Sequence, residues 1–163
     1  MARPIKRQQL NMIQRKQSVF LLVAAILTIV CLCLPIGVFH PKNLGVDTAM
    51  YNLWIQYGNG SVSYTVCPLF CILLLATVTS FFTIFKFNNR KLQIKLCGWN
   101  NLLIVVWYIA YAVFAWMFKG ELDADFKIGF VSVLPLVSMI LIFMVRKAIK
   151  ADEALIRAAD RIR

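Results

Sequence analysis

Hydrophobic and polar positions divide this chain into four long apolar stretches joined by polar segments. None of the four contains Asp, Glu, Lys, Arg or His, and they cover residues 18–39, 66–85, 96–118 and 128–145. Each stretch is about 18–23 residues long, which is the length that a helix needs to cross a hydrocarbon core of about 30 Å. The pattern therefore predicts an all-α membrane protein built on a bundle of four transmembrane helices.

Composition supports the same class of protein. Hydrophobic residues make up 61% of the 163 residues, and the mean hydropathy is +0.74. A soluble domain of this size is rarely so apolar. Four spans and their connections use nearly the whole chain, so we expect a single transmembrane domain over residues 18–145 and no separate soluble domain.

Positive charge is distributed in a way that predicts the orientation. Of the 18 Lys and Arg residues, 15 lie in the N-terminus, the gap at 86–95 or the tail, and the gaps at 40–65 and 119–127 hold the other three. Lys and Arg concentrate on the cytoplasmic side of membrane proteins. Both termini are therefore predicted to be cytoplasmic, and the net charge of +11 is interpreted as a topology signal rather than a nucleic-acid contact.

The two terminal segments are predicted to differ in structure. Residues 1–17 form a basic cytoplasmic N-terminus, in which 1–11 is expected to be a disordered extension, Met12 offers a second start of translation, and Ser18 caps the first span. Residues 146–163 are rich in helix formers and carry an apolar stripe, which predicts a cytoplasmic amphipathic helix. Such a helix could lie on anionic lipid headgroups or dock on a partner protein.

The long outer gap at 40–65 is predicted to form a short β-hairpin. A turn signal at 57–61 separates two β-prone runs, 50–57 and 61–65. We expect this hairpin to lie at the outer membrane–water interface, where aromatic rings are favoured; a ligand-binding cap is the functional alternative. The aromatic residues concerned are Tyr51, Trp54, Tyr57 and Tyr64.

Polar residues inside the predicted spans are few. Pro135 lies in the middle of the fourth span, where we expect it to kink the helix. A polar side chain within a membrane usually bonds to a neighbouring helix, although the paired asparagines could also line a polar substrate site. The candidates for interhelical contacts are Asn100, Asn101, Ser132 and Ser138.

Cysteine usage argues against disulfides and metal sites. All five Cys lie in predicted spans, so the outer gaps can hold no disulfide framework. Cys67 and Cys71 would share a helix face, but no second pair of ligands accompanies them, and His40 is the sole histidine. The sequence therefore predicts no metal and no cofactor.

Three segments carry a resemblance to a known family. Residues 12–27, the motif Asn89-Arg90-Lys91-Leu92-Gln93, and the tail with Asp152-Glu153-Ala154-Leu155 and Ala159-Asp160-Arg161-Ile162-Arg163 resemble a family of four-span proteins from the phylum Bacteroidota, catalogued as domain of unknown function 4293. In the tail, Ala151 and Ile162 depart from the Lys and Leu of the family pattern. The resemblance implies a bacterial inner-membrane location and four helices, but no activity.

The charged residues of this chain lie outside the predicted spans, and their positions indicate a class of function. The spans hold no acid, His or Lys, which disfavours an enzyme. We expect a structural or accessory subunit whose basic cytoplasmic face meets a partner protein, a homo-oligomer or anionic lipid; the alternative is a small transporter, channel or lipid-binding membrane protein. The candidate contact residues are Arg15, Arg90, Lys91, Gln93, Asp152, Glu153, Arg157, Asp160 and Arg161.

Overall fold

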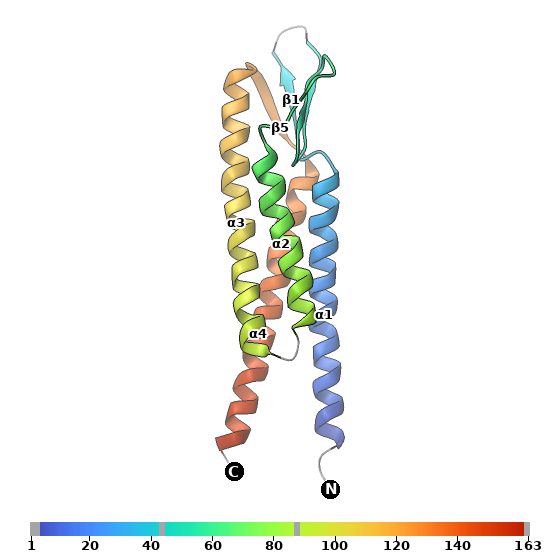
Figure 1. The fold of residues 1–163 in the computed structure, drawn as a ribbon, viewed down its shortest axis with the longest axis vertical. Coiled ribbons are helices and arrows are strands. Elements are labelled where there is room, and N and C mark those ends of the chain that lie inside the picture. The colour runs from blue at the N-terminus through green and yellow to red at the C-terminus, as the bar shows by residue number, and fades with distance from the viewer. Residues whose placement is uncertain (1–3, 43–44, 87–88, 162–163) are drawn as a thin grey trace.

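Four long helices lie side by side and a small sheet covers one end of them (Figure 1). The computed structural model describes the backbone of residues 4–42, 45–86 and 89–161, and the side chains of 17–42, 45–86 and 89–154. Both ends of the chain lie at the end opposite the sheet (Figure 1). The helices are α1 (Pro4–Cys33), α2 (Cys67–Phe85), α3 (Arg90–Glu121) and α4 (Leu134–Arg161), with a short 3-10 helix, η1 (Phe130–Val133), before α4.

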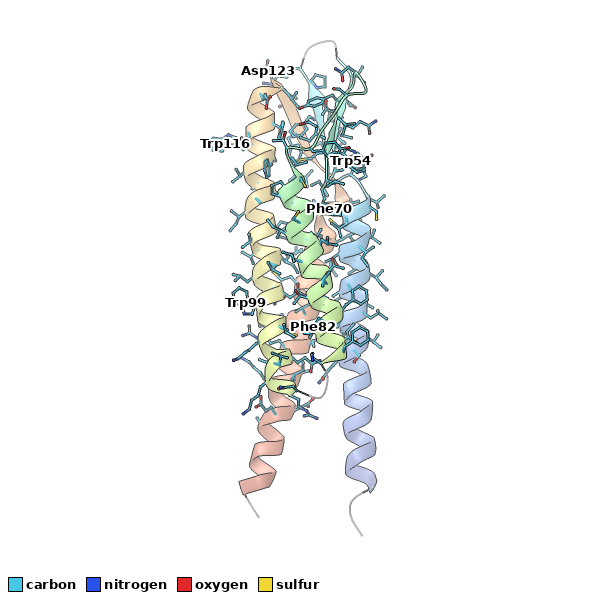
Figure 2. All side chains as sticks on the ribbon, in the orientation of Figure 1. Trp54, Phe70, Phe82, Trp99, Trp116 and Asp123 are labelled. Carbon is cyan, nitrogen blue, oxygen red and sulfur yellow. The ribbon has the colours of Figure 1, made fainter. Side chains whose placement is uncertain are left out.

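The helices pack as two layers that share one interior. α1 contacts α2 and α4, and α3 also contacts α2 and α4, so each helix has two neighbours. Small and aliphatic residues fill the middle of the interior, including Leu21, Ala24, Ala76, Ile104 and Ile142, all fully buried. The outward faces remain apolar, and Figure 2 shows Trp99 and Trp116 projecting outward from α3.

Among the described residues, three helices are long and apolar enough to cross a membrane: α2, α3, and the run Phe130–Ala154 that joins η1 to most of α4. The apolar part of α1, Gln17–Cys33, is shorter. The predicted spans 66–85 and 96–118 therefore coincide with α2 and with the middle of α3.

The structure is mostly helical, but its five-stranded sheet is larger than the short hairpin expected beside an all-α bundle. Five antiparallel strands lie in the order β4-β3-β2-β1-β5. β1 pairs with β5 over five residue pairs, which brings the two outer gaps of the chain together although they are far apart in sequence. The strands are β1 (Gly37–Pro41), β2 (Thr48–Met50), β3 (Ile55–Gln56), β4 (Val62–Ser63) and β5 (Ala124–Ile128).

The predicted hairpin is present as one part of this sheet. β3 and β4 pair on either side of the turn at 57–61, where Tyr57 donates to the carbonyl of Ser61. The first run, 50–57, is not one strand, because the chain turns between β2 and β3 with Tyr51 donating to the carbonyl of Trp54.

Helix boundaries differ from the prediction at both outer spans. α1 begins at Pro4, so Ser18 lies inside the helix instead of capping it, and residues expected to be disordered are helical from Pro4 on. Residues 37–39, predicted as the end of the first span, belong to β1. α4 begins at Leu134, so Pro135 occupies its first turn, where the missing N–H costs little, and does not lie in the middle of the helix. α4 then continues unbroken to Arg161, as predicted for a helical tail.

Candidate functional site at the basic end

We call the end of the molecule that carries the α2–α3 turn the basic end, and the opposite end the sheet end. The described cations at the basic end lie on three segments: Lys86 follows α2, Arg90, Lys91 and Lys95 open α3, and Arg146, Lys147 and Lys150 lie along α4. The structure thus brings together cations that are more than 50 residues apart in sequence. The predicted contact residues fall into two groups here, those on the surface and those used in packing.

The motif Asn89-Arg90-Lys91-Leu92-Gln93 closes the α2–α3 turn. The side chain of Asn89 accepts a hydrogen bond from the backbone of Leu92 and caps α3. Gln93 is only 5% exposed, and its amide donates to the carbonyl of Thr83 on α2 at 3.3 Å. Gln93 therefore joins two helices and is not available for a contact at the surface. Lys91 is exposed and Arg90 is half-buried.

Asp152 also makes a contact within the molecule. Its carboxylate accepts a hydrogen bond of 2.7 Å from the amide of Gln17, which links α4 to α1 across 135 positions of sequence. Glu153 is half-exposed beside it. The remaining predicted contact residues, Arg15, Arg157, Asp160 and Arg161, lie outside the residues whose side chains the structure describes.

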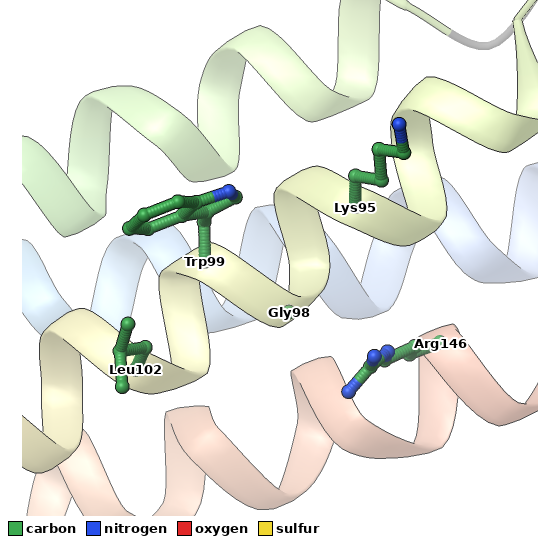
Figure 3. A pocket seen from close by; sticks show the side chains of 5 residues that line it. All are labelled: Lys95, Gly98, Trp99, Leu102 and Arg146. Carbon is green, nitrogen blue, oxygen red and sulfur yellow. The ribbon is translucent and has the colours of Figure 1, made fainter.

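A groove lies between α3 and α4 at the basic end (Figure 3). Its volume is about 380 Å³, and it is lined by Lys95, Gly98, Trp99, Leu102 and Arg146. Figure 3 shows Arg146 reaching from α4 toward α3 beside Gly98. The sequence did not predict this groove, because the groove depends on which helices pack together. The only signal in the sequence was a basic residue at the edge of each of two predicted spans, Lys95 and Arg146.

The polar residues predicted to make interhelical contacts differ in the bonds that they form. Asn100 donates to the hydroxyl of Ser80 from α3 to α2, and Ser138 donates at 3.1 Å to the carbonyl of Ala24 from α4 to α1. Ser132 donates to the carbonyl of Gly129 on its own segment. Asn101 is half-exposed, and within the described part of the chain its side-chain oxygen is buried without a hydrogen-bond partner.

A buried hydrogen-bond network fixes the sheet to the helices. Asn52, which the sequence did not single out, is fully buried; its amide donates to the carbonyl of Cys31 at 2.7 Å and its oxygen accepts from the indole of Trp107 at 2.9 Å. The Trp107 ring stacks on Tyr111 at 5.3 Å, and the hydroxyl of Tyr111 donates to the carbonyl of Ile36. These contacts place the sheet directly on the helix ends.

The predicted interfacial aromatics lie at this sheet end in different environments. The rings of Tyr51 and Trp54 lie 5.3 Å apart and both residues are half-buried. Tyr57 packs against the core, whereas Tyr64 is exposed. The aromatic group therefore does not form one surface.

One ion pair at the sheet end joins the two outer gaps, and a second polar contact lies within the first gap. Lys42 donates to the carboxylate of Asp123 at 3.2 Å, and His40 contacts Asp47 at 2.8 Å. The hydrogen bond to Asp123, together with the negative charges of Asp123 and Asp125, raises the pKa of Lys42 above its ordinary value. Within the described residues, no group of three or more His, Cys, Asp and Glu side chains is placed to hold a metal ion.

In the part of the chain that the structure describes, these observations define a mostly helical protein with three helices long and apolar enough to span a membrane, a small antiparallel sheet at one end and cations gathered at the other. The chain belongs to the family described as Domain of unknown function (DUF4293), whose model matches residues 13–162. The resemblance predicted from residue 12 to the C-terminus is therefore confirmed. A comparison with curated proteins found no match to this chain.

Proposed function

We propose that the chain is an integral protein of a bacterial inner membrane, with α1–α4 as four spans and both termini in the cytoplasm. Three helices have the required length, and the 17-residue stretch Gln17–Cys33 of α1 lies at the lower limit for a span. α1 packs between α2 and α4, both candidate spans, so a membrane around them also surrounds α1. An even number of spans then places 15 of 18 basic residues on one side.

Two outward-facing tryptophans support this placement. Trp99 and Trp116 are 64% and 79% exposed and project from α3 near its two ends (Figure 2). At about 1.5 Å per residue they lie about 25 Å apart along the helix axis. Tryptophan is enriched at both membrane–water interfaces, which are separated by a similar distance.

We propose further that the protein is a structural or accessory subunit whose basic end meets a partner protein or anionic lipid. One observation carries this proposal: cations gather at the basic end, while the buried hydroxyl groups between the helices have hydrogen-bond partners within the molecule, as at Thr28, Thr77, Ser80 and Ser138. Thr77 donates to the hydroxyl of Thr28 at 2.9 Å from α2 to α1, as Asn100 does to Ser80. The helix interior is thus occupied by packing contacts.

A small transporter, channel or lipid-binding membrane protein is the second candidate. Coupled transporters usually carry ionisable residues within the membrane, and the four predicted spans contain no Asp, Glu, Lys, Arg or His. Within this class, the groove between α3 and α4 favours lipid binding over transport.

Extraction in polymer-bounded native membrane discs tests the accessory role. An affinity tag inserted in the turn at Gly58–Gly60 leaves the basic end free for partners. We expect a stoichiometric partner or a shell enriched in anionic lipid, lost in the double variant Lys91→Gln/Lys147→Gln. The matched control is Lys119→Gln/Lys127→Gln, which removes equal charge at the sheet end. Recovery of a lone chain in unenriched lipid would contradict the proposal.

A further inference from the structure

We propose that the groove between α3 and α4 binds the phosphate-bearing headgroup of one anionic phospholipid, with the adjoining acyl chain lying along Leu102. This inference rests on the proposed membrane placement, because a membrane lipid reaches the groove only when both helices lie in the bilayer. The volume of about 380 Å³ lies within the range of sites that bind small molecules.

The groove has its shape because of a glycine. Lys95, Gly98, Trp99 and Leu102 are spaced as neighbours on one face of α3. A Cβ atom at Gly98 would lie only 3.3 Å from Cζ and Nη2 of Arg146. Glycine at this position therefore lets the guanidinium group of Arg146 lie against the backbone of α3 at Gly98 (Figure 3).

The two cations lie at the level expected for lipid phosphates. Lys95 is the last charged residue before the apolar stretch 96–118, and Arg146 is the first after the stretch 128–145. Leu102 is seven residues beyond Lys95, about 10 Å further along the helix axis. Leu102 and Trp99 are both exposed. The groove thus begins at the polar boundary and extends into the apolar zone, as a phospholipid does.

The chemistry of the lining matches an anion. The five lining residues include two cations and no acid. Nε of Arg146 is buried and has no hydrogen-bond partner among the described residues. A buried donor without an acceptor is unfavourable, and a guanidinium group binds phosphate through two parallel hydrogen bonds. A phosphate oxygen in the groove would supply the missing acceptor, with Lys95 as the second positive charge.

Native mass spectrometry of the full chain in mild detergent tests the proposal. The probes are dioleoylphosphatidylglycerol, zwitterionic dioleoylphosphatidylcholine and inorganic phosphate. We expect one tight phosphatidylglycerol site, and each of Lys95→Gln and Arg146→Gln should weaken it about fivefold to tenfold. Equal binding of the two lipids would overturn the proposal. Displacement of phosphatidylglycerol by inorganic phosphate at similar concentration would make free phosphate the ligand and would overturn it too.

Matched variants separate a built site from diffuse attraction. Lys91→Gln removes an exposed charge at the same end but outside the groove. We therefore expect it to change the affinity for phosphatidylglycerol by less than about twofold. Gly98→Leu should fill the groove and weaken binding at least as much as Arg146→Gln. Gly120→Leu, on the same helix, is its control, because a Cβ at Gly120 contacts nothing within 4 Å. If Lys91→Gln lowers the affinity for phosphatidylglycerol as much as Lys95→Gln does, the proposed site is refuted.

Two further measurements keep the outcomes interpretable. Thermal unfolding of each variant, followed by circular dichroism, shows whether weaker binding reflects lost folding, and Arg146→Lys is the milder alternative if Arg146→Gln fails to fold. It retains the charge but not the paired hydrogen bonds, so it should bind less tightly than wild type and more tightly than Arg146→Gln. Reporter fusions test the membrane topology separately. If they confirm four spans but the protein binds both lipids equally, this inference is refuted and the proposed function is not.

Discussion

Replacing Asn52 with Ala should release the sheet from the helix ends. Asn52 is fully buried, and it donates to the carbonyl of Cys31 at 2.7 Å and accepts from the indole of Trp107 at 2.9 Å. Alanine leaves both of these buried groups without the partner they have now. Each orphaned buried group costs about 1–3 kcal/mol. The free energy of unfolding should therefore fall by about 2–6 kcal/mol.

The measurement is an unfolding titration with sodium dodecyl sulfate in mixed micelles, followed by tryptophan fluorescence. Gln56→Ala, at an exposed position of β3, is the control and should change stability by less than about 0.5 kcal/mol. A double-mutant cycle between Asn52→Ala and Trp107→Phe should show a coupling of at least about 0.5 kcal/mol. If Asn52→Ala behaves like the control, or if the two changes add without coupling, the network does not hold the sheet.

Two further predictions concern the sheet end. Gly129→Ala would place a Cβ 2.8 Å from the carbonyl oxygen of Ile36, a backbone atom that cannot easily move, and should cost about 1–3 kcal/mol in the same titration. Gly120→Ala meets nothing within 4 Å and should be neutral or stabilising by up to about 1 kcal/mol. Equal effects of Gly129→Ala and Gly120→Ala on stability would contradict the close contact between Gly129 and Ile36. For Lys42, the raised pKa means that its pair with Asp123 stabilises the fold while the amine is protonated and is lost as the pH rises through that raised value. The difference in thermal midpoint between wild type and Lys42→Gln should thus be present at neutral pH and vanish well above pH 10.5; a difference that persists would refute the linkage.

The long helices could be predicted from the sequence, whereas the sheet could not be predicted in full. An uncharged run of 20 residues has few alternatives to a helix, so 66–85 nearly matches α2. Gly37, Val38 and Phe39 are just as apolar and were counted with the first span, although they form β1. The alternation Ala-Asp-Phe-Lys-Ile at 124–128 is a strand signal that was missed, and its paired residues in β1 lie between 83 and 91 positions away in sequence.

At the basic end, the sequence indicated which segments matter but not how their side chains are used. The order of residues in the motif around Gln93 suggested a surface contact, but the structure buries Gln93 against Thr83 because α2 and α3 turn back on each other there. Asp152 is likewise bonded to Gln17. The groove at Gly98 and Arg146 required the pairing of α3 with α4, which no local pattern specifies.

The central claim is that four helices cross the membrane and leave the basic end in the cytoplasm. The most direct test fuses a fluorescent protein that matures only in the cytoplasm before Met1 and, separately, after Arg163. A phosphatase active only outside the cytoplasm is inserted into the turn at 58–60. The account predicts fluorescence from both terminal fusions and phosphatase activity from the turn. Fluorescence from one terminus only would mean an odd number of spans, with the short apolar stretch of α1 outside the membrane, and would contradict the account.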